Sequence, residues 1–298
     1  MNARDFLPPI AMNVARRIFD RSGRKQYATY VDALASCTEH GYENVGIVNV
    51  VLEKTKRYRE SVSGGAIHLN ATSAYSLCSL LASIDSQEIN VIDFGGACGS
   101  HYFLARAVLP RSCKLRWIVV ETPEMAKEAG SVLSTGELSF SSDLRDAVDS
   151  MKRVDLLHTS GTLQCVDKPY EYLQRLVTAS ASHILFNRLG LTKGNHDVIT
   201  VHESWLSWNG PGPMPSGIPD QKVRYPFIFP RESTFYDILK QSYDVVMTFD
   251  DTSGTYPVGN EPIVGIGVLA RLKRRDPAAQ QSAPADGLAS ASLRQTRR

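Results

Sequence analysis

The sequence predicts an α/β fold built around a mostly parallel β-sheet, and three observations support this prediction. From residue 90 onward, short apolar runs alternate with helical segments, a rhythm typical of strand–helix–strand units. The run 117–120 is continuously apolar, as expected of a parallel strand that is buried on both faces. Near the C-terminal end, the runs 243–249 and 263–272 follow one another without a helix, which indicates an antiparallel hairpin at one end of the sheet.

A helical N-terminal segment, residues 1–88, is predicted ahead of the sheet. Apolar residues recur at helical spacing across 10–19, and the arginines fall largely on the other face. Such a basic amphipathic helix can lie on a membrane surface through residues 4–25, or it can pack against the rest of the protein, which we favour. Two further helices are expected at 30–37 and 71–84.

The predicted sheet domain covers residues 89–275. Its remaining expected elements are strands at 90–94, 115–121, 138–141, 154–159 and 183–188, and helices at 101–109, 124–133, 169–179 and 231–241. Residues 191–230 interrupt this rhythm with six prolines and two tryptophans, and we expect a long loop that packs as a cap rather than a disordered insertion. The tail, 276–298, has no periodicity and is predicted to be disordered.

Composition narrows the class of protein. The chain has 298 residues, and its net charge of +2 does not indicate a nucleic-acid partner, which usually requires a strongly basic face. Its five cysteines are odd in number and form no C-x-x-C pair, and no apolar run approaches the roughly 20 residues that span a bilayer. We therefore expect a cytoplasmic protein. Because no His, Asp and Glu cluster stands at metal-ligand spacing, we also expect metal-independent chemistry.

A glycine-rich turn follows the first predicted strand, where ligands bind in open α/β sheets. Gly95, Gly96 and Gly99 let the backbone bend sharply and approach a ligand closely. Glu121 ends the next predicted strand, 22 residues after Gly99, where an acid can accept hydrogen bonds from ribose hydroxyls. This arrangement fits a dinucleotide or S-adenosylmethionine.

Two details favour S-adenosylmethionine over a dinucleotide. Phe94 occupies the first glycine position of the dinucleotide pattern G-x-G-x-x-G, so the match to that pattern is incomplete. Asp93 places a carboxylate beside the turn, where it would repel a pyrophosphate and attract the ammonium and sulfonium of S-adenosylmethionine.

Residues 91–99 resemble motif I of the class I S-adenosylmethionine-dependent methyltransferases. A nearer resemblance, over about residues 4 to 273, is to a bacterial group of methyltransferases often encoded near surface-polysaccharide genes. The pieces that carry it, besides motif I, are Leu7-Pro8-Pro9, Gly41-Tyr42-Glu43-Asn44, Ser160-Gly161-Thr162-Leu163-Gln164 and Asn187-Arg188. The resemblance implies a Rossmann-like sheet of seven strands with an antiparallel last strand, and a small molecule or sugar hydroxyl as the methyl acceptor.

The resemblance also implies roles for individual residues. Asp93, Gly95, Gly96 and Gly99 would hold the methionine portion of the cofactor, and Glu121 the ribose. Ser142 and Asp143 would flank the adenine, although Asp143 could equally be the N-cap of the next helix. His158 would lie beside the transferred methyl group.

Methyl transfer to oxygen needs a base that accepts the proton of the acceptor. The candidates are His158, His202 in the expected cap, and Asp197. His158 could equally be a structural histidine whose ring bonds to a neighbouring group. Arg188 could pair with an acidic group of the substrate or form a salt bridge inside the domain.

Two other functions remain open at the level of the sequence. An NAD-dependent oxidoreductase or epimerase could use the same turn and Glu121, but the chain lacks the first glycine and a Tyr-x-x-x-Lys pair. A non-catalytic protein could instead use the same fold to bind a partner.

Overall fold

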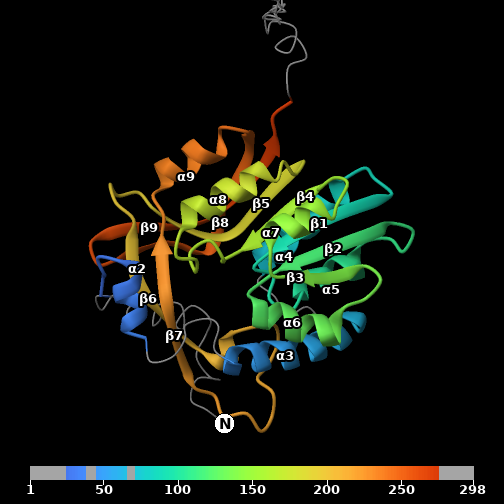
Figure 1. The fold of residues 1–298 in the computed structure, drawn as a ribbon, viewed down its shortest axis with the longest axis horizontal. Coiled ribbons are helices and arrows are strands. Elements are labelled where there is room, and N and C mark those ends of the chain that lie inside the picture. The colour runs from blue at the N-terminus through green and yellow to red at the C-terminus, as the bar shows by residue number, and fades with distance from the viewer. Residues whose placement is uncertain (1–24, 38–44, 66–70, 275–298) are drawn as a thin grey trace, which may run out of the picture.

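The computed structural model describes residues 25–37, 45–65 and 71–274 (Figure 1). Several expectations fall outside these residues: the helix at 10–19, the membrane contact through 4–25, and the tail 276–298. Two pieces of the family resemblance, at 7–9 and 41–44, fall outside them as well.

Seven strands form one sheet in the order β3-β2-β1-β4-β5-β9-β8. The bounds are β1 Glu88–Phe94, β2 Lys114–Val120, β3 Leu138–Ser141, β4 Leu156–Ser160, β5 His183–Thr192, β8 Tyr243–Val258 and β9 Glu261–Leu272. Strands β1 to β5 pair in parallel, whereas β9 is antiparallel to both β5 and β8. The predicted mostly parallel sheet with an antiparallel last strand is confirmed.

Helices cover both faces of this sheet, as predicted (Figure 1). One face packs under α3 Val45–Ser63, α4 Ala71–Ser83, α5 Ser100–Val108 and α6 Pro123–Leu133. The other face packs under α7 Leu144–Asp149, α8 Pro169–Thr178 and α9 Glu232–Leu239. Strand residues contribute to the two cores alternately: Val91 belongs to the first and Ile92 to the second.

Among its described residues, the N-terminal segment contains a helix that was not expected from the sequence. Besides α4 and the short α2, Tyr30–Ala35, there is the 19-residue α3, whose apolar pattern is interrupted by buried Lys54 and Thr55. The Lys54 ammonium donates to the carbonyls of Ser207, at 2.8 Å, and Asn209, at 2.7 Å. These bonds attach α3 to the segment that the sequence predicts as a cap.

That segment is not the irregular loop that its prolines predict. Residues 191–230 contain β6 Val198–Trp205, the short 3-10 helix η3 Leu206–Trp208, and β7 Lys222–Phe229. Strands β6 and β7 pair antiparallel in a sheet of their own, in which the prolines lie mainly between the strands. The backbone N–H of Ile228 donates to the carbonyl of Gln164, so this hairpin is tied to the loop that follows β4.

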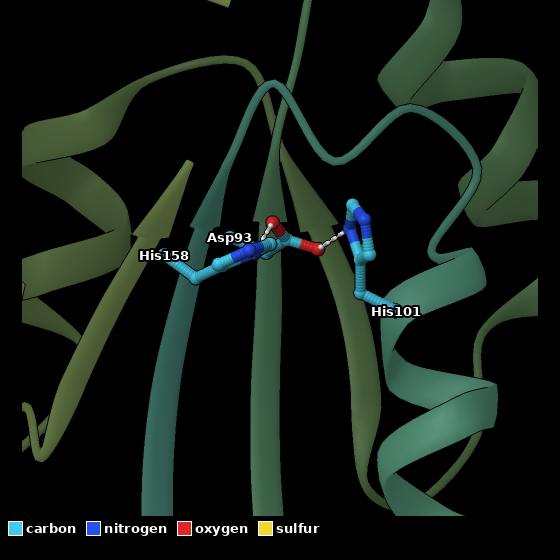
Figure 2. A group of neighbouring side chains, drawn as sticks. All are labelled: Asp93, His101 and His158. Carbon is cyan, nitrogen blue, oxygen red and sulfur yellow. Dashed lines mark hydrogen bonds and ion pairs between the residues drawn. The ribbon is translucent and has the colours of Figure 1, made fainter. Parts of the chain in front are cut away.

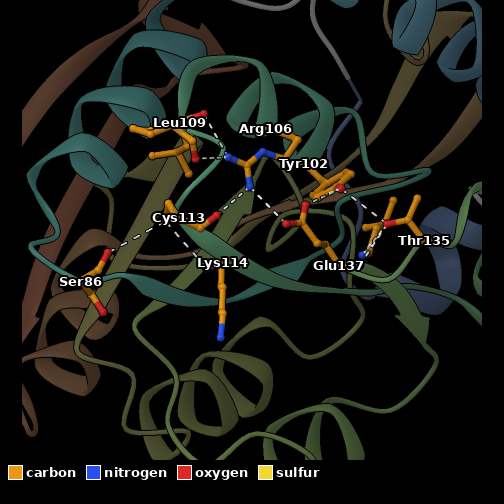
Figure 3. Close-up of polar contacts among 10 residues, drawn as sticks. Ser86, Tyr102, Arg106, Leu109, Cys113, Lys114, Thr135 and Glu137 are labelled. Atoms are coloured by element: carbon orange, nitrogen blue, oxygen red, sulfur yellow. Dashed lines mark hydrogen bonds and ion pairs between the residues drawn. The ribbon is translucent and has the colours of Figure 1, made fainter.

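Helix α5, which follows the glycine turn, is held in place by a network of polar contacts at its C-terminal end (Figure 3). The Arg106 guanidinium donates to Glu137 at 3.2 Å and to the carbonyls of Leu109 and Cys113, and Tyr102 donates to the second oxygen of Glu137 at 3.0 Å. The network fixes the helix against the start of β3.

The strand order reverses between β1 and β4, because β2 and β3 extend the sheet to one side and β5 to the other. In open α/β sheets, ligands bind at such a switch point, beyond the carboxyl ends of the strands. Among the described residues, no helix is both long and apolar enough to cross a membrane.

Candidate functional site

The glycine turn occupies the carboxyl end of β1, beside the switch point. Gly95 and Gly99 have φ of 70° and 82°, values that favour glycine. A Cβ on Gly95 would overlap the Thr162 side chain from the loop after β4, and one on Gly96 would overlap the Asp93 carboxylate. Glycine is therefore required at position 95 by both packing and backbone conformation, at 96 by packing, and at 99 by backbone conformation.

Asp93 lies at the centre of a cluster with two histidines (Figure 2). Its Oδ1 lies 2.8 Å from Nδ1 of His158 on β4, and its Oδ2 lies 3.1 Å from Nδ1 of His101 in the first turn of α5. The rings of His101 and His158 meet edge to face, with centroids 4.6 Å apart. Both oxygens of the buried carboxylate are thus used by imidazoles.

His158 is also engaged through its second nitrogen. Asn187 Nδ2 on β5 lies 3.1 Å from Nε2, and the Asn187 Oδ1 accepts a hydrogen bond from Ser76 of α4 at 2.9 Å. The consistent assignment has Nδ1–H of His158 donating to Asp93 and Nε2 accepting from Asn187. His158 is therefore a histidine whose ring is hydrogen-bonded on both sides, the structural role considered from the sequence. To act as a base, it would first have to lose the hydrogen bond between Nε2 and Asn187.

Burial and hydrogen bonding set the charges of this cluster. Burial lowers the pKa of His158 and outweighs the opposite effect of Asp93, which favours a neutral imidazole at neutral pH. Burial alone would raise the pKa of Asp93, but its interactions with His101 and His158, hydrogen bonds among them, hold it well below its usual value. The cluster is an ionised carboxylate held between two imidazoles.

Sequence reasoning missed His101. Its available signal was its position, two residues after Gly99, in the first turn of the helix that leaves the glycine turn. Its Nδ1 faces Asp93, and within the part of the chain that the structure describes its Nε2 has no hydrogen-bond partner. A histidine whose Nδ1–H donates to a carboxylate presents Nε2 as an acceptor.

The same three residues offer a candidate metal site that sequence spacing did not reveal. Ligand atoms of Asp93, His101 and His158 lie within 4.8 Å of one another. The two Nδ1 atoms also lie at hydrogen-bond distances from the carboxylate, so hydrogen bonds alone account for the cluster. Metal-independent chemistry remains a prediction.

Glu121 lies directly after β2, across the turn from Asp93. Its Oε1 accepts from the N–H of Ala97, inside the glycine turn, at 3.1 Å, and its Oε2 accepts from Thr122 at 2.8 Å. Burial raises the pKa of Glu121 to about 7, and the two backbone N–H groups only partly oppose this effect. Glu121 therefore titrates near neutral pH while it braces the turn.

The structure places the two residues predicted to flank the adenine at the end of β3, both exposed. Asp143 is the N-cap of α7: its Oδ1 accepts from the N–H of Arg145 at 2.7 Å and of Asp146 at 3.0 Å. This is the alternative that the sequence left open for Asp143. An adenine contact by Ser142 or Asp143 stays a prediction.

The other predicted chemical groups are spread over the molecule. His202 lies on β6, with its ring 5.2 Å from the rings of both Tyr225 and Phe227, and not on the sheet that carries His158. Asp197 accepts from the N–H of Arg231 and from Tyr170, so its carboxylate binds neighbouring chain segments. Cys98 is buried, and burial raises the pKa of its thiol, which argues against a reactive thiolate.

No protein-family model matches the chain, and no curated protein matches it. Solved structures resemble it distantly. The N-terminal domain of EvdMO1, with SAH bound, is 11% identical, with a TM-score of 0.42, over 91% of this chain and 100% of that one. A methyltransferase from Clostridium acetobutylicum, described as S-adenosylmethionine-dependent, is 10% identical, with a TM-score of 0.41, over 74% and 97%. Human N-acetylserotonin methyltransferase, in complex with SAM, is 16% identical, with a TM-score of 0.42, over 89% and 68%.

Proposed function

We propose that the chain is an S-adenosylmethionine-dependent methyltransferase that acts on a small molecule or a sugar hydroxyl. The observation that carries this proposal is the ionised, buried Asp93 carboxylate behind a glycine turn at the switch point of the sheet. The resemblance to methyltransferases encoded near polysaccharide genes supports a saccharide acceptor. The free state of all five cysteines agrees with a location in the cytoplasm.

The electrostatics of the turn favour a cationic ligand. Asp93 and Glu121 place two acids at the ends of adjacent strands, where a pyrophosphate would be repelled. Because the Asp93 oxygens are both used by imidazoles, its charge would act on the methionine ammonium through His101, whose Nε2 would accept from that ammonium. Glu121 would accept hydrogen bonds from the ribose. Gly95, Gly96 and Gly99 would let the backbone of the turn lie close to the cofactor.

Methyl transfer from a sulfonium requires mainly that the acceptor be held in line with the methyl group. His202 would be the base for an oxygen acceptor, since it lies on the hairpin that is tied to the loop after β4. His158 would hold Asp93 in place and would act as a base only after losing Asn187.

Calorimetry with the full chain tests the proposal. We expect S-adenosylmethionine and S-adenosylhomocysteine to bind in the micromolar range and NAD⁺ to give no saturable heat. Binding of NAD⁺ alone would support the oxidoreductase alternative. Cofactor binding without transfer of labelled methyl groups to any saccharide or small-molecule extract would support the non-catalytic alternative.

Metal-independent chemistry gives a separate prediction. Because the Nδ1 atoms of His101 and His158 are used by Asp93, we expect protein treated with EDTA to bind S-adenosylhomocysteine as tightly as untreated protein. Metal analysis of the purified protein provides the second readout. A stoichiometric metal ion, lost with EDTA together with cofactor affinity, would contradict this expectation.

A further inference from the structure

The β5 strand contains a bulge at the carboxyl edge of the sheet. Phe186 pairs with Val268 and Leu189 with Ile266, so that Asn187 and Arg188 together face one residue of β9. At the bulge, Arg188 has φ of 51°, in the left-handed region where a residue with a Cβ is strained. Its carbonyl accepts from Gln164 Nε2 at 2.7 Å, which holds the bulge in this conformation.

The side chain of Arg188 is fixed but not neutralised. Its Nε donates to Ser160 Oγ at 3.0 Å and its Nη2 to the Ser160 carbonyl at 2.9 Å. The guanidinium packs over Gly161, where an added Cβ would lie 3.2 Å from Nη2. Over the described ranges, no salt bridge of Arg188 is found, so the salt bridge considered from the sequence is absent there.

Arg188 is an exposed residue, and it lies near the glycine turn. The loop after β4 connects the two, because Gly161 contacts Arg188 and the next residue, Thr162, donates to the carbonyl of Gly95. The β6–β7 hairpin is attached to the same loop through Gln164. The N–H of Ile228 on β7 donates to the Gln164 carbonyl, and Gln164 Nε2 donates to the carbonyl of Arg188.

We propose that Arg188 binds an anionic group of the methyl acceptor, a phosphate or a carboxylate, in a subsite between the loop after β4 and the β6–β7 hairpin. Ser160 holds Arg188 through Nε and Nη2, and among the described residues Nη1 has no hydrogen-bond partner. A guanidinium recognises oxyanions through charge-assisted hydrogen bonds. Left-handed backbone strain at a non-glycine residue persists where surrounding structure maintains it, and such strain concentrates at binding sites. The assignment of this subsite to the methyl acceptor rests on the proposed function.

Isothermal titration of the full chain with methyl phosphate and with acetate, at constant ionic strength, tests the subsite. We expect saturable binding of at least one anion to the wild type and binding at least about tenfold weaker to Arg188→Gln, as expected for loss of a charge-assisted contact. Arg188→Lys should fall between the two, because it keeps the charge but loses the planar donor group. Arg145→Gln, on the exposed face of α7, should leave affinity unchanged.

The two anions distinguish the sources of the ligand. Binding of methyl phosphate alone assigns a phosphate-bearing acceptor, and binding of acetate alone a carboxylate. Absence of saturable heat with either anion, or equal affinity in Arg188→Gln, Arg188→Lys and wild type, would overturn the proposal. Titration of the same variants with S-adenosylhomocysteine separates the anion result from the proposed function. Unchanged affinity of the variants for S-adenosylhomocysteine shows that they are folded. If the wild type fails to bind S-adenosylhomocysteine, the proposed methyltransferase function is refuted, but the anion result still stands.

Discussion

Compared with the β1–β2 half of the sheet's carboxyl edge, the β4–β5 half carries the opposite charge, on the exposed residue Arg188. On the first half, Asp93 is buried and Glu121 partly buried, and each carboxylate already accepts hydrogen bonds from the protein. On the second half, the Arg188 side chain donates to Ser160, and its carbonyl accepts from Gln164. The difference supports our proposal of two ligand groups of opposite charge that meet across the switch point.

Both halves contain residues with a left-handed backbone. In the acidic half, Gly95 and Gly99 adopt positive φ without strain, and Ala97 between them has φ of 51° with only a Cβ as its side chain. In the basic half, the residue at φ of 51° is Arg188, although glycine would adopt that conformation without strain. The two halves therefore differ in the side chain kept at positive φ, which in the basic half is a charged guanidinium.

The largest effect is expected from Gly95→Ala, which alters the acidic half. The new Cβ would overlap Thr162 and would stand at a φ of 70°, so we expect a loss of roughly 3 kcal/mol in the free energy of unfolding, together with loss of cofactor binding. Urea denaturation measures the free energy of unfolding, and calorimetry measures cofactor binding. Gly136→Ala is the matched control, since a Cβ there meets nothing within 4 Å. Equal stability of the two variants would show that the turn is not tightly packed.

Glu121→Gln should have the next largest effect, a loss of affinity for S-adenosylhomocysteine whose size depends on pH. The raised pKa of Glu121, about 7, means that the free protein binds a proton there below neutral pH. If ribose hydroxyls donate to the ionised form, affinity for S-adenosylhomocysteine rises with pH up to about 7, by up to about tenfold per pH unit below it. Glu121→Gln should bind roughly tenfold more weakly at pH 8 and lose the pH dependence, whereas Glu124→Gln should match the wild type. A wild-type affinity that is constant from pH 5.5 to 8 would argue against the ribose contact.

The smallest effect concerns strain in the basic half. Arg188→Ala and Arg188→Gly both remove the guanidinium, but only glycine adopts φ of 51° freely. We expect Arg188→Gly to be the more stable of the two by about 1 kcal/mol, a difference of about 2–4 °C in Tm. At Arg145, inside α7, the same pair should have the opposite order, because alanine favours a helix. An Arg188→Ala variant as stable as Arg188→Gly would show that the bulge relaxes and that no strain is maintained.

The parts of the site that are local in sequence were predictable. Asp93 lies at the end of β1, and the glycines and Glu121 directly follow β1 and β2. Because the carboxyl ends of parallel strands share one edge, the proximity of these residues follows from the pattern. The antiparallel β9 was predictable because no helix connects it to β8.

The remaining features depend on contacts distant in sequence. The ring of His101 meets that of His158, 57 residues away, and no spacing rule relates them. The hairpin was missed because prolines and glycines dominate its composition, while the pairing of β6 with β7 is set by tertiary contacts such as that of Ile228 with Gln164. The bulge at Arg188 is likewise visible only in the register of β5 with β9.

The most direct test is to measure how Asp93→Asn changes affinity for two ligands that differ only in their amino-acid portion, S-adenosylhomocysteine and 5′-methylthioadenosine. If the ionised carboxylate attracts the methionine ammonium through His101, the substitution weakens S-adenosylhomocysteine binding by at least about tenfold and leaves 5′-methylthioadenosine binding nearly unchanged. Equal changes for both ligands, or no change for S-adenosylhomocysteine in the folded variant, would contradict the assignment of this half of the sheet edge to a cationic cofactor.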